Sequence, residues 1–305
     1  MDSATGMSPS TSRIIVAIPT TGRAPILADT VRWIAQQTRI PDALLISIGG
    51  PEDIAPGTAD DLPFPIEVLT GPKGGSPQRN RILEALQPGD IAVFLDDDFL
   101  MAPDFLAETE RLFRDHPDMV LATGTVLADG INSSGFDYTN GSRILAERLA
   151  AQPATDRLDP VYNGYGCNMA VRATPVIEHT LRFDEDLPLY SWLEDVDFSR
   201  RLAAHGTLKK AGALRGVHLG TKTGRSKGVL LGYSQVAYPI YLIRKGTMHW
   251  KRALRLMMGN IFANATRSFK PEPWIDRRGR LWGNALAFRD ALTGRMSPGR
   301  ILDLR

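Results

Sequence analysis

The sequence predicts an α/β fold, in which a mostly parallel sheet is flanked by helices and followed by a mainly helical C-terminal extension. Short apolar runs alternate with segments of helical periodicity through the first half of the chain. The most strand-like run, residues 91–95, is followed at once by three aspartates. After residue 228 the composition shifts to basic, methionine and aromatic residues. These observations predict a flexible leader at 1–13, a main domain at 14–227 and an extension at 228–305.

The first elements are predicted from apolar runs and from the residues that end them. Residues 14–18 are apolar and β-branched and stop at Pro19, as a buried parallel strand would. Residues 25–37 carry apolar side chains at helical spacing. Two further strands are expected at 43–48, where glycines follow, and at 66–69. Together these segments begin a sheet of helix-connected strands.

The next elements lead to the aspartates and continue beyond them. A helix begins at residue 76 with Pro77 at its first position, and residues 91–95 form a strand. A helix at 103–114 and a strand at 119–125 follow. In such sheets ligands bind beyond the carboxyl ends of the strands, and the aspartates lie at such an end.

The middle of the chain is less regular. Residues 128–165 are rich in Gly, Asn, Ser and Tyr and have weak periodicity, so we expect loops that shape a cleft. Residues 162–172 are expected to form a loop followed by a strand, and residues 192–202 a helix.

The composition excludes several classes of protein. With 305 residues, 43% of them apolar and 23% charged, the chain has the composition of a soluble globular protein. The single cysteine, Cys167, excludes an internal disulfide framework and fits a reducing cytoplasm. Residues 1–13 lack a signal-peptide pattern, and no apolar run approaches the ~20 residues that cross a bilayer. We therefore expect a cytoplasmic protein.

The net charge of +2 hides an asymmetry between the two parts of the chain. Residues 1–239 contain 22 Lys and Arg against 30 Asp and Glu, whereas residues 240–305 contain 14 against 4. Within 241–269 the basic residues alternate with Trp, Leu, Met, Ile and Phe. At helical spacing this pattern suits an amphipathic basic segment on an anionic membrane surface, so peripheral contact with the inner face of a membrane is one hypothesis. The default explanation is a helix packed on the main domain with a basic solvent face.

Asp96, Asp97 and Asp98 repel one another unless positive charge neutralises them. A hard divalent ion, Mn²⁺ or Mg²⁺, prefers oxygen ligands and commonly bridges to phosphate oxygens. The alternative is a solvated acidic turn. The position directly after a buried strand favours a metal site.

Several segments of the sequence resemble motifs of a known family. Residues 95–99 resemble the metal and ribose motif of family 2 glycosyltransferases with the GT-A fold. Residues 75–80, with Gly-Asp at 89–90, are similar to the segment just upstream of that motif. The resemblance extends from about residue 14 to residue 218.

The resemblance implies a nucleoside-diphosphate sugar as donor. The residues expected at the donor nucleotide are Pro19, Thr20, Arg23, Arg79, Asp96 and Asp97. The resemblance also implies that Asp98 is a direct metal ligand and that Asp96 contacts the metal or the ribose. One departure concerns the base, because the second strand here ends in Ser-Ile-Gly-Gly, not in an acidic pair. Glu52 or Asp53 is the candidate to replace this acidic pair. A UDP-sugar is the favoured donor, and the sequence does not determine the base.

A second acidic cluster lies at the start of the helix expected at 192–202. Acidic residues in a first helical turn are favoured by the helix dipole, which is one explanation of Glu194, Asp195 and Asp197. The Glu-Asp pair also resembles the family's catalytic-base motif. On that resemblance Asp195 removes the proton of the acceptor hydroxyl, with Asp197 as its competitor.

Three further residues are implied in the site. Asn168, Glu194 and Trp192 are expected on the side of the cleft that holds the donor sugar and the acceptor. His218 lies between apolar neighbours, which suits a packed core histidine. Its separation from the Glu-Asp pair resembles that of a third metal ligand in several GT-A enzymes.

The sequence therefore predicts a metal-dependent glycosyltransferase of the hexosyltransferase type, with inversion implied by the resemblance. Its acceptor would be a glycan or lipid-linked hydroxyl in polysaccharide biosynthesis, and we expect no nucleic-acid partner. The alternatives are a nucleotidyltransferase and a non-catalytic sugar-nucleotide or glycan-binding module. A dinucleotide-dependent dehydrogenase is disfavoured because no G-x-G-x-x-G follows the first strand.

Overall fold

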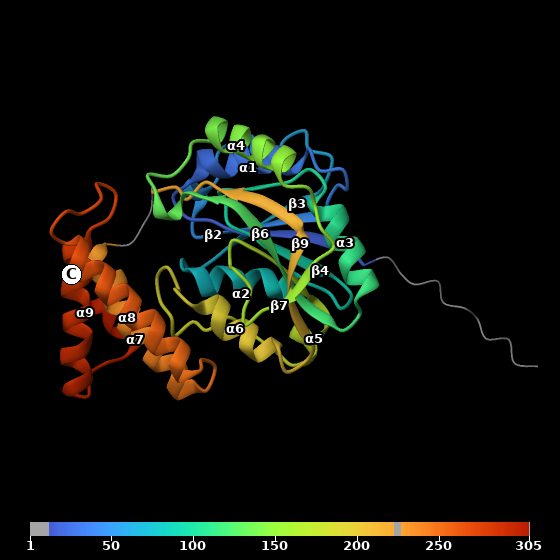
Figure 1. Cartoon of the computed structure of the whole chain (residues 1–305). Helices are drawn as coiled ribbons and strands as arrows, with labels where there is room; N and C mark the ends of the chain where they lie inside the picture. Colours follow the sequence, from blue (N-terminus) through green and yellow to red (C-terminus); the bar gives the residue numbers. More distant parts are fainter. Residues whose placement is uncertain (1–11, 223–226, 305) are drawn as a thin grey trace, which may run out of the picture.

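The computed structural model describes residues 12–222 and 227–304 (Figure 1). Most of the leader predicted at 1–13 lies outside these residues. In the described part of the chain the centre is one nine-stranded sheet, with the order β3-β2-β1-β4-β8-β6-β9-β5 and with β7 paired to β9. The strands are β1 (Ile14–Pro19), β2 (Ala43–Ile48), β3 (Ile66–Thr70), β4 (Ile91–Leu95), β5 (Phe99–Met101), β6 (Met119–Asp129), β7 (Leu158–Pro160), β8 (Asn168–Arg172) and β9 (Thr207–His218).

The sheet has a parallel half and a mixed half. Strands β3, β2, β1 and β4 are parallel neighbours, so their carboxyl ends meet at one edge. β8 runs antiparallel to both β4 and β6, and β6 is parallel to β9. The expected α/β sheet flanked by helices is confirmed.

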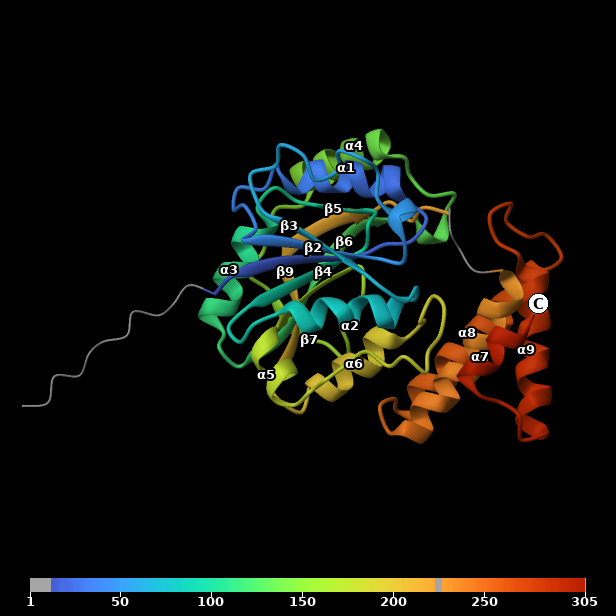
Figure 2. The ribbon, with the colours of Figure 1, turned by 180° about the vertical axis from the view of Figure 1, so that it is seen from behind.

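Helices cover both faces of the sheet because the strands are apolar on both sides (Figure 2). In β1, Ile14, Val16 and Ile18 face one core and Ile15 and Ala17 face the other. The first core also contains apolar residues of α1 (Ala24–Ile34) and α3 (Phe105–Asp115). The second contains those of α2 (Gly75–Ala85), α5 (Ala173–Glu178) and α6 (Glu194–Leu202).

The expectation of loops at 128–165 is wrong in part. This stretch contains a 14-residue helix, α4 (Tyr138–Ala151), which packs on β5 and β9. Asp137 caps it by accepting a hydrogen bond from the backbone N–H of Asn140. Only Gly141 and Leu145 of the helix are fully buried. Its apolar stripe is therefore too narrow to give a clear helical period.

Three helices form the C-terminal part, namely α7 (Gly228–Lys245), α8 (Trp250–Arg267) and α9 (Arg277–Leu292). They share one apolar core with Leu187, Leu193 and Val196 of the main domain. Figure 1 shows them side by side at one end of the molecule. Among the described residues, none of the helices combines the length and the apolar character needed to span a bilayer.

Candidate active site

A cavity of about 540 Å³ opens at the carboxyl ends of β1 and β4. Nine of the predicted site residues line it: Pro19, Thr20, Arg23, Arg79, Asp96, Asp97, Trp192, Glu194 and Asp195. Asp98 and His218 lie next to Asp96 without lining the cavity themselves. The structure thus brings both acidic clusters and the first loop to one place.

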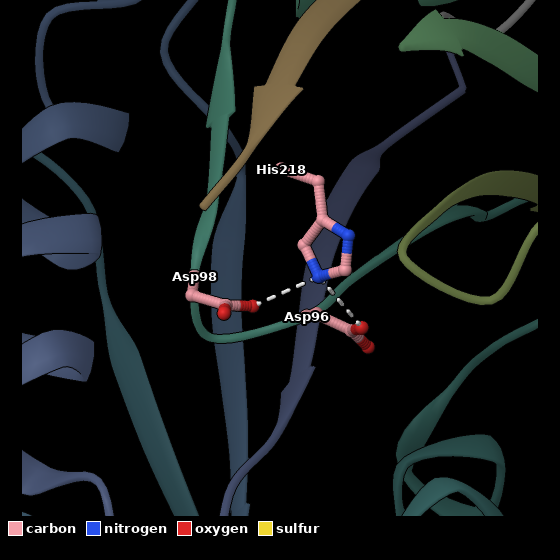
Figure 3. Close-up of side chains that lie close together, drawn as sticks. All are labelled: Asp96, Asp98 and His218. Atoms are coloured by element: carbon pink, nitrogen blue, oxygen red, sulfur yellow. Dashed lines mark ion pairs between the residues drawn. The ribbon is translucent and has the colours of Figure 1, made fainter. Parts of the chain in front are cut away.

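Asp96, Asp98 and His218 form a compact cluster, in which one donor atom from each lies within 4.8 Å of the others (Figure 3). Nε2 of His218 points between the two carboxylates, 3.2 Å from Asp98 Oδ1 and 3.7 Å from Asp96 Oδ2. The pairing of β5 with β9 sets His218 opposite Phe99, beside the turn that carries the aspartates. The cluster therefore follows from strand register.

The chemistry of this cluster fits a divalent cation. Asp98 is almost completely buried, and the 3.2 Å contact of its Oδ1 with His218 Nε2 falls short of hydrogen-bond geometry. Its other oxygen accepts the backbone N–H of Thr221 at 2.8 Å. Burial would raise the pKa of Asp98, but the contact and charge of His218 bring it below its ordinary value. Two carboxylates and one imidazole nitrogen are suitable ligands for Mn²⁺.

The residue that positions His218 was not predicted from the sequence. Asp129 Oδ1 lies 2.9 Å from His218 Nδ1, while Asp129 Oδ2 accepts a hydrogen bond from the Tyr165 hydroxyl at 3.0 Å. Burial lowers the pKa of His218, but its contacts with Asp129 and Asp98 outweigh this and raise it to about 10. An Nδ1–H donated to Asp129 leaves Nε2 of a neutral ring free for a metal. The only sequence feature that could have indicated this role is the position of Asp129 at the end of β6, four residues beyond the expected end of that strand.

Asp97 has a different role from its two neighbours. Its carboxylate accepts hydrogen bonds from the Thr20 hydroxyl and from Arg23 Nη1, the latter at 2.8 Å. Burial raises the pKa of Asp97 to about 7, although the charge of Arg23 opposes the shift. Asp97 thus ties the first loop to the turn after β4.

Arg79 connects the two acidic clusters. Its Nη2 lies 3.3 Å from Asp96 Oδ1 and its Nη1 lies 3.1 Å from Glu194 Oε1. The guanidinium also lies over the ring of Phe183 and is almost completely buried. Burial raises the pKa of Glu194 to about 8, although Arg79 opposes the shift. Arg79 therefore fixes the distance between the turn after β4 and the start of α6.

Asp195 lies at the cavity wall in a fixed orientation. Its Oδ2 accepts the backbone N–H of Gly166 at 3.1 Å and its Oδ1 that of Val196 at 2.8 Å. Burial raises the pKa of Asp195 above its ordinary value, although the Gly166 hydrogen bond and Arg79 oppose this. A Cβ at Gly166 would come within 3.3 Å of both Arg79 Nη2 and Glu194 Oε1, so a side chain here would have to displace these groups by a few tenths of an ångström.

The segment before Asp195 has an unusual backbone. Leu189, Ser191 and Leu193 have φ values of 60°, 52° and 71°, although none is glycine. Residues with side chains rarely adopt this conformation, which costs of order 1–3 kcal/mol each. The segment lines the cavity next to Asp195 and packs on the C-terminal helices. That packing is what holds the strained backbone in place.

Several residues considered from the sequence do not reach the cavity. Asp197 is fully buried and pairs with Arg201 and Lys245. Asp53 accepts three backbone N–H groups, and Glu52 pairs with Lys73.

Asn168, expected beside the donor sugar, does not line the cavity. It is fully buried in β8 and contacts Thr123, so the preceding residues Gly166 and Cys167 line the cavity in its place.

Comparison with known structures identifies the fold. Residues 1–349 of TarS from S. aureus superpose with a TM-score of 0.54 at 14% identity, covering 93% of this chain and 82% of that one. The mannosyltransferase PcManGT from Pyrobaculum calidifontis, in complex with GDP-Man and Mn²⁺, gives a TM-score of 0.50 at 17% identity and covers 96% and 86%. GalNAc-T7 with UDP, GalNAc and Mn²⁺ gives 0.52 at 12% identity and covers 97% and 57%.

The family is shown by sequence. A search of curated proteins finds no match. The family model described as glycosyl transferase family 2, however, matches residues 15–177, which is more than half of the chain. This range includes the turn after β4 and the loop after β1, which carry the three aspartates and the Thr20 and Arg23 partners of Asp97. The chain therefore belongs to glycosyltransferase family 2 and is a glycosyltransferase with the GT-A fold.

Proposed function

We propose that the protein is a metal-dependent, inverting glycosyltransferase that moves a sugar from a nucleoside diphosphate to a hydroxyl of a glycan or lipid-linked acceptor. One observation carries this proposal: the metal-ligand cluster and the Asp195 carboxylate meet at one cavity, connected by Arg79. The metal-ligand cluster has the chemistry to hold the diphosphate, and the Asp195 carboxylate has the chemistry to accept a proton.

Asp96, Asp98 and His218 would hold Mn²⁺ or Mg²⁺. When bound, the ion supplies positive charge to the diphosphate as the bond to the sugar breaks. Asp98 and His218 are buried and fixed by neighbours, whereas Asp96 is partly exposed in the cavity. Asp96 is therefore the ligand that can also reach the ribose.

The loop after β1 and the α2 terminus form the donor side. Pro19, Thr20 and Arg23 line the cavity there, and Gln78 holds the loop by donating to the carbonyls of Thr20 and Ser47. UDP is the favoured nucleotide, and GDP is the rival. Structures of fold neighbours contain UDP-GlcNAc in one case and GDP-Man in another, so they support a nucleotide sugar without selecting the base.

Asp195 would take the proton of the acceptor hydroxyl as its oxygen attacks the anomeric carbon. The hydrogen bonds from Gly166 and Val196 aim the carboxylate, and burial raises its pKa, which makes it a stronger base. Attack from the side opposite the diphosphate inverts the anomeric configuration. Trp192 and Glu194 line the adjoining wall, where the acceptor would lie.

A thermal-shift panel of UDP-, GDP- and dTDP-sugars, with and without Mn²⁺, tests the donor and the metal. The cognate donor should raise the melting temperature only when the metal is present, because ligands stabilise the state that binds them. A melting temperature that no sugar nucleotide changes would contradict the proposal. Synthesis of a nucleotide sugar from a sugar phosphate would instead support a nucleotidyltransferase.

Two variants test the base. Asp195→Asn should abolish transfer and leave donor affinity nearly unchanged. Asp197→Asn should lower the melting temperature and keep most of the turnover per folded molecule, because Asp197 pairs away from the cavity. Full turnover by Asp195→Asn would refute the assignment. Donor binding with neither transfer nor hydrolysis in the wild type would favour a binding module.

A further inference from the structure

Helix α8 presents an apolar stripe to solvent. Trp250, Leu254, Met258 and Phe262 recur every four residues and are 54%, 46%, 54% and 70% exposed. Residues four apart lie on the same side of a helix. Phe269, just after the helix, is 88% exposed. A continuous apolar surface of this kind marks an interaction site.

The outward direction of this stripe is fixed by packing on the other side of α8. Ala253 is buried and Leu256, Met257 and Ile261 pack on the C-terminal core. The fully buried Asn264 donates to Gln235 of α7 at 2.8 Å and to Asn284 of α9 at 3.0 Å. Rotating α8 to bury the stripe would turn Asn264 away from α7 and α9, break both hydrogen bonds and leave the buried Gln235 and Asn284 side chains without this partner. The stripe therefore faces outward in the folded protein.

Basic residues accompany the stripe. Helix α8 contains Lys251, Arg252, Arg255 and Arg267 and no acidic residue. Lys251 and Arg255 are exposed, and no carboxylate of residues 12–222 or 227–304 lies within ion-pair distance of either. An apolar stripe with Trp and Phe beside unneutralised Lys and Arg has the chemistry of a helix that lies in the interface of an anionic bilayer.

A second copy of the chain fits this surface less well. In a two-fold dimer α8 would face α8, because such an interface places the same surface on both subunits. Each helix would then bring Lys251, Arg252 and Arg255 with no acidic residue of α8 to neutralise them, whereas Arg267 pairs with Glu272. We infer that the α8 stripe, with its basic residues, is a docking surface for membranes containing anionic lipids.

The position of α8 gives docking a consequence for the site. The three C-terminal helices share a core with the segment that forms one wall of the cavity, including Leu193 and Trp192. Docking through α8 would therefore bring the domain that carries the cavity to the bilayer surface. This step rests on the proposed function and favours a lipid-linked acceptor over a soluble glycan.

Co-sedimentation with vesicles tests the docking surface without any turnover. The full-length protein should bind vesicles containing phosphatidylglycerol and remain in solution with pure phosphatidylcholine. The variant Met258→Ser/Phe262→Ser should lose binding at least tenfold, because both side chains are exposed and their loss leaves the core intact. The variant Lys251→Gln/Arg255→Gln should bind more weakly and with less dependence on salt. Val68→Ser, at an exposed position of β3, is the matched control and should bind like the wild type.

Three results would overturn the inference. In the first, the wild-type protein stays in solution when anionic vesicles are added. In the second, the Met258→Ser/Phe262→Ser variant binds vesicles as well as the wild type does. In the third, vesicle binding does not change with salt concentration or with the anionic lipid content. Light scattering that shows a dimer abolished by Met258→Ser/Phe262→Ser, without vesicle binding, would assign the surface to self-association. Vesicle binding does not depend on whether a sugar nucleotide raises the melting temperature. The docking surface and the proposed transferase function can therefore be refuted independently of each other.

Discussion

At the scale of single residues, the contact between Asp129 and His218 determines which ring nitrogen faces the aspartates. Asp129 is itself held by Tyr165 and by the backbone N–H of Ile131. Carboxylates that orient a metal-binding histidine typically contribute 10–100-fold to metal affinity. We expect Asp129→Asn to weaken Mn²⁺ binding by about that factor, with kcat recovering at saturating metal.

Titration of free Mn²⁺ by electron paramagnetic resonance measures this effect. Asp159→Asn on β7 is the matched control, because that carboxylate pairs only with the exposed Arg157 within the described chain. Equal Mn²⁺ affinities for Asp129→Asn and the wild type would show that His218 is oriented by other contacts. An unchanged melting temperature of the variant without metal would separate positioning from folding.

The buried carboxylate of Asp195 should also be visible in the pH dependence of transfer. A base acts only when ionised, and burial raises the pKa of Asp195. Activity should therefore fall, as the pH decreases, at a pH above the ordinary aspartate pKa of ~3.9. The measurement is kcat/KM against pH at saturating Mn²⁺, since protons also compete for His218. A decrease of kcat/KM centred at the ordinary aspartate pKa would argue against Asp195 as the base.

At the scale of elements, the apolar strands were predictable and the site contacts were not. The runs at β1, β2 and β4 gave the parallel half of the sheet, because buried strands are continuously apolar. Strands β5, β7 and β9 were missed. β5 and β7 have only three residues each, which are too few for a periodicity. The bridging role of Arg79 and the contact of Asp129 with His218 depend on which strands become neighbours. A single sequence does not specify that adjacency.

Helix α6 is joined to α7 by a network of charges. Lys245 Nζ contacts Asp197 at 2.9 Å and also pairs with Asp184, while Arg201 reaches Asp197 from the same helix. Lys245→Met leaves the fully buried Asp197 with fewer partners. We expect it to lower the free energy of unfolding by about 1–3 kcal/mol. As with Asp197→Asn, kcat per folded molecule should change little, because this network lies outside the cavity that Asp195 lines.

Urea denaturation measures this change. Arg143→Met is the matched control, since it breaks an exposed pair with Glu147 on α4 and should change stability by less than about 0.5 kcal/mol. If both variants had the same stability, the network would contribute nothing beyond a surface ion pair.

At the scale of the whole molecule, the change of composition near residue 228 separates two chemical characters. The acidic body holds the cavity, and the basic extension presents α8. The shared core of α7 with Leu187, Leu193 and Val196 nevertheless joins the two parts mechanically. We propose that 14–227 and 228–305 differ in role and fold as one cooperative unit.

A chain truncated after residue 227 tests this unity. It would expose Leu187, Leu193 and Val196, which are buried in the whole protein, and remove the hydrogen bond from Tyr238 to the Pro188 carbonyl. Exposing three such side chains costs about 4–9 kcal/mol in total, comparable with the ~5–15 kcal/mol that stabilises a typical domain. The strained backbone at 189–193 would also lose the packing that holds it. We expect the truncated chain to lack a cooperative thermal transition in circular dichroism and to transfer no sugar. A transition at the temperature of the whole protein, with unchanged donor affinity, would instead show that the main domain folds alone and that the extension serves only for docking.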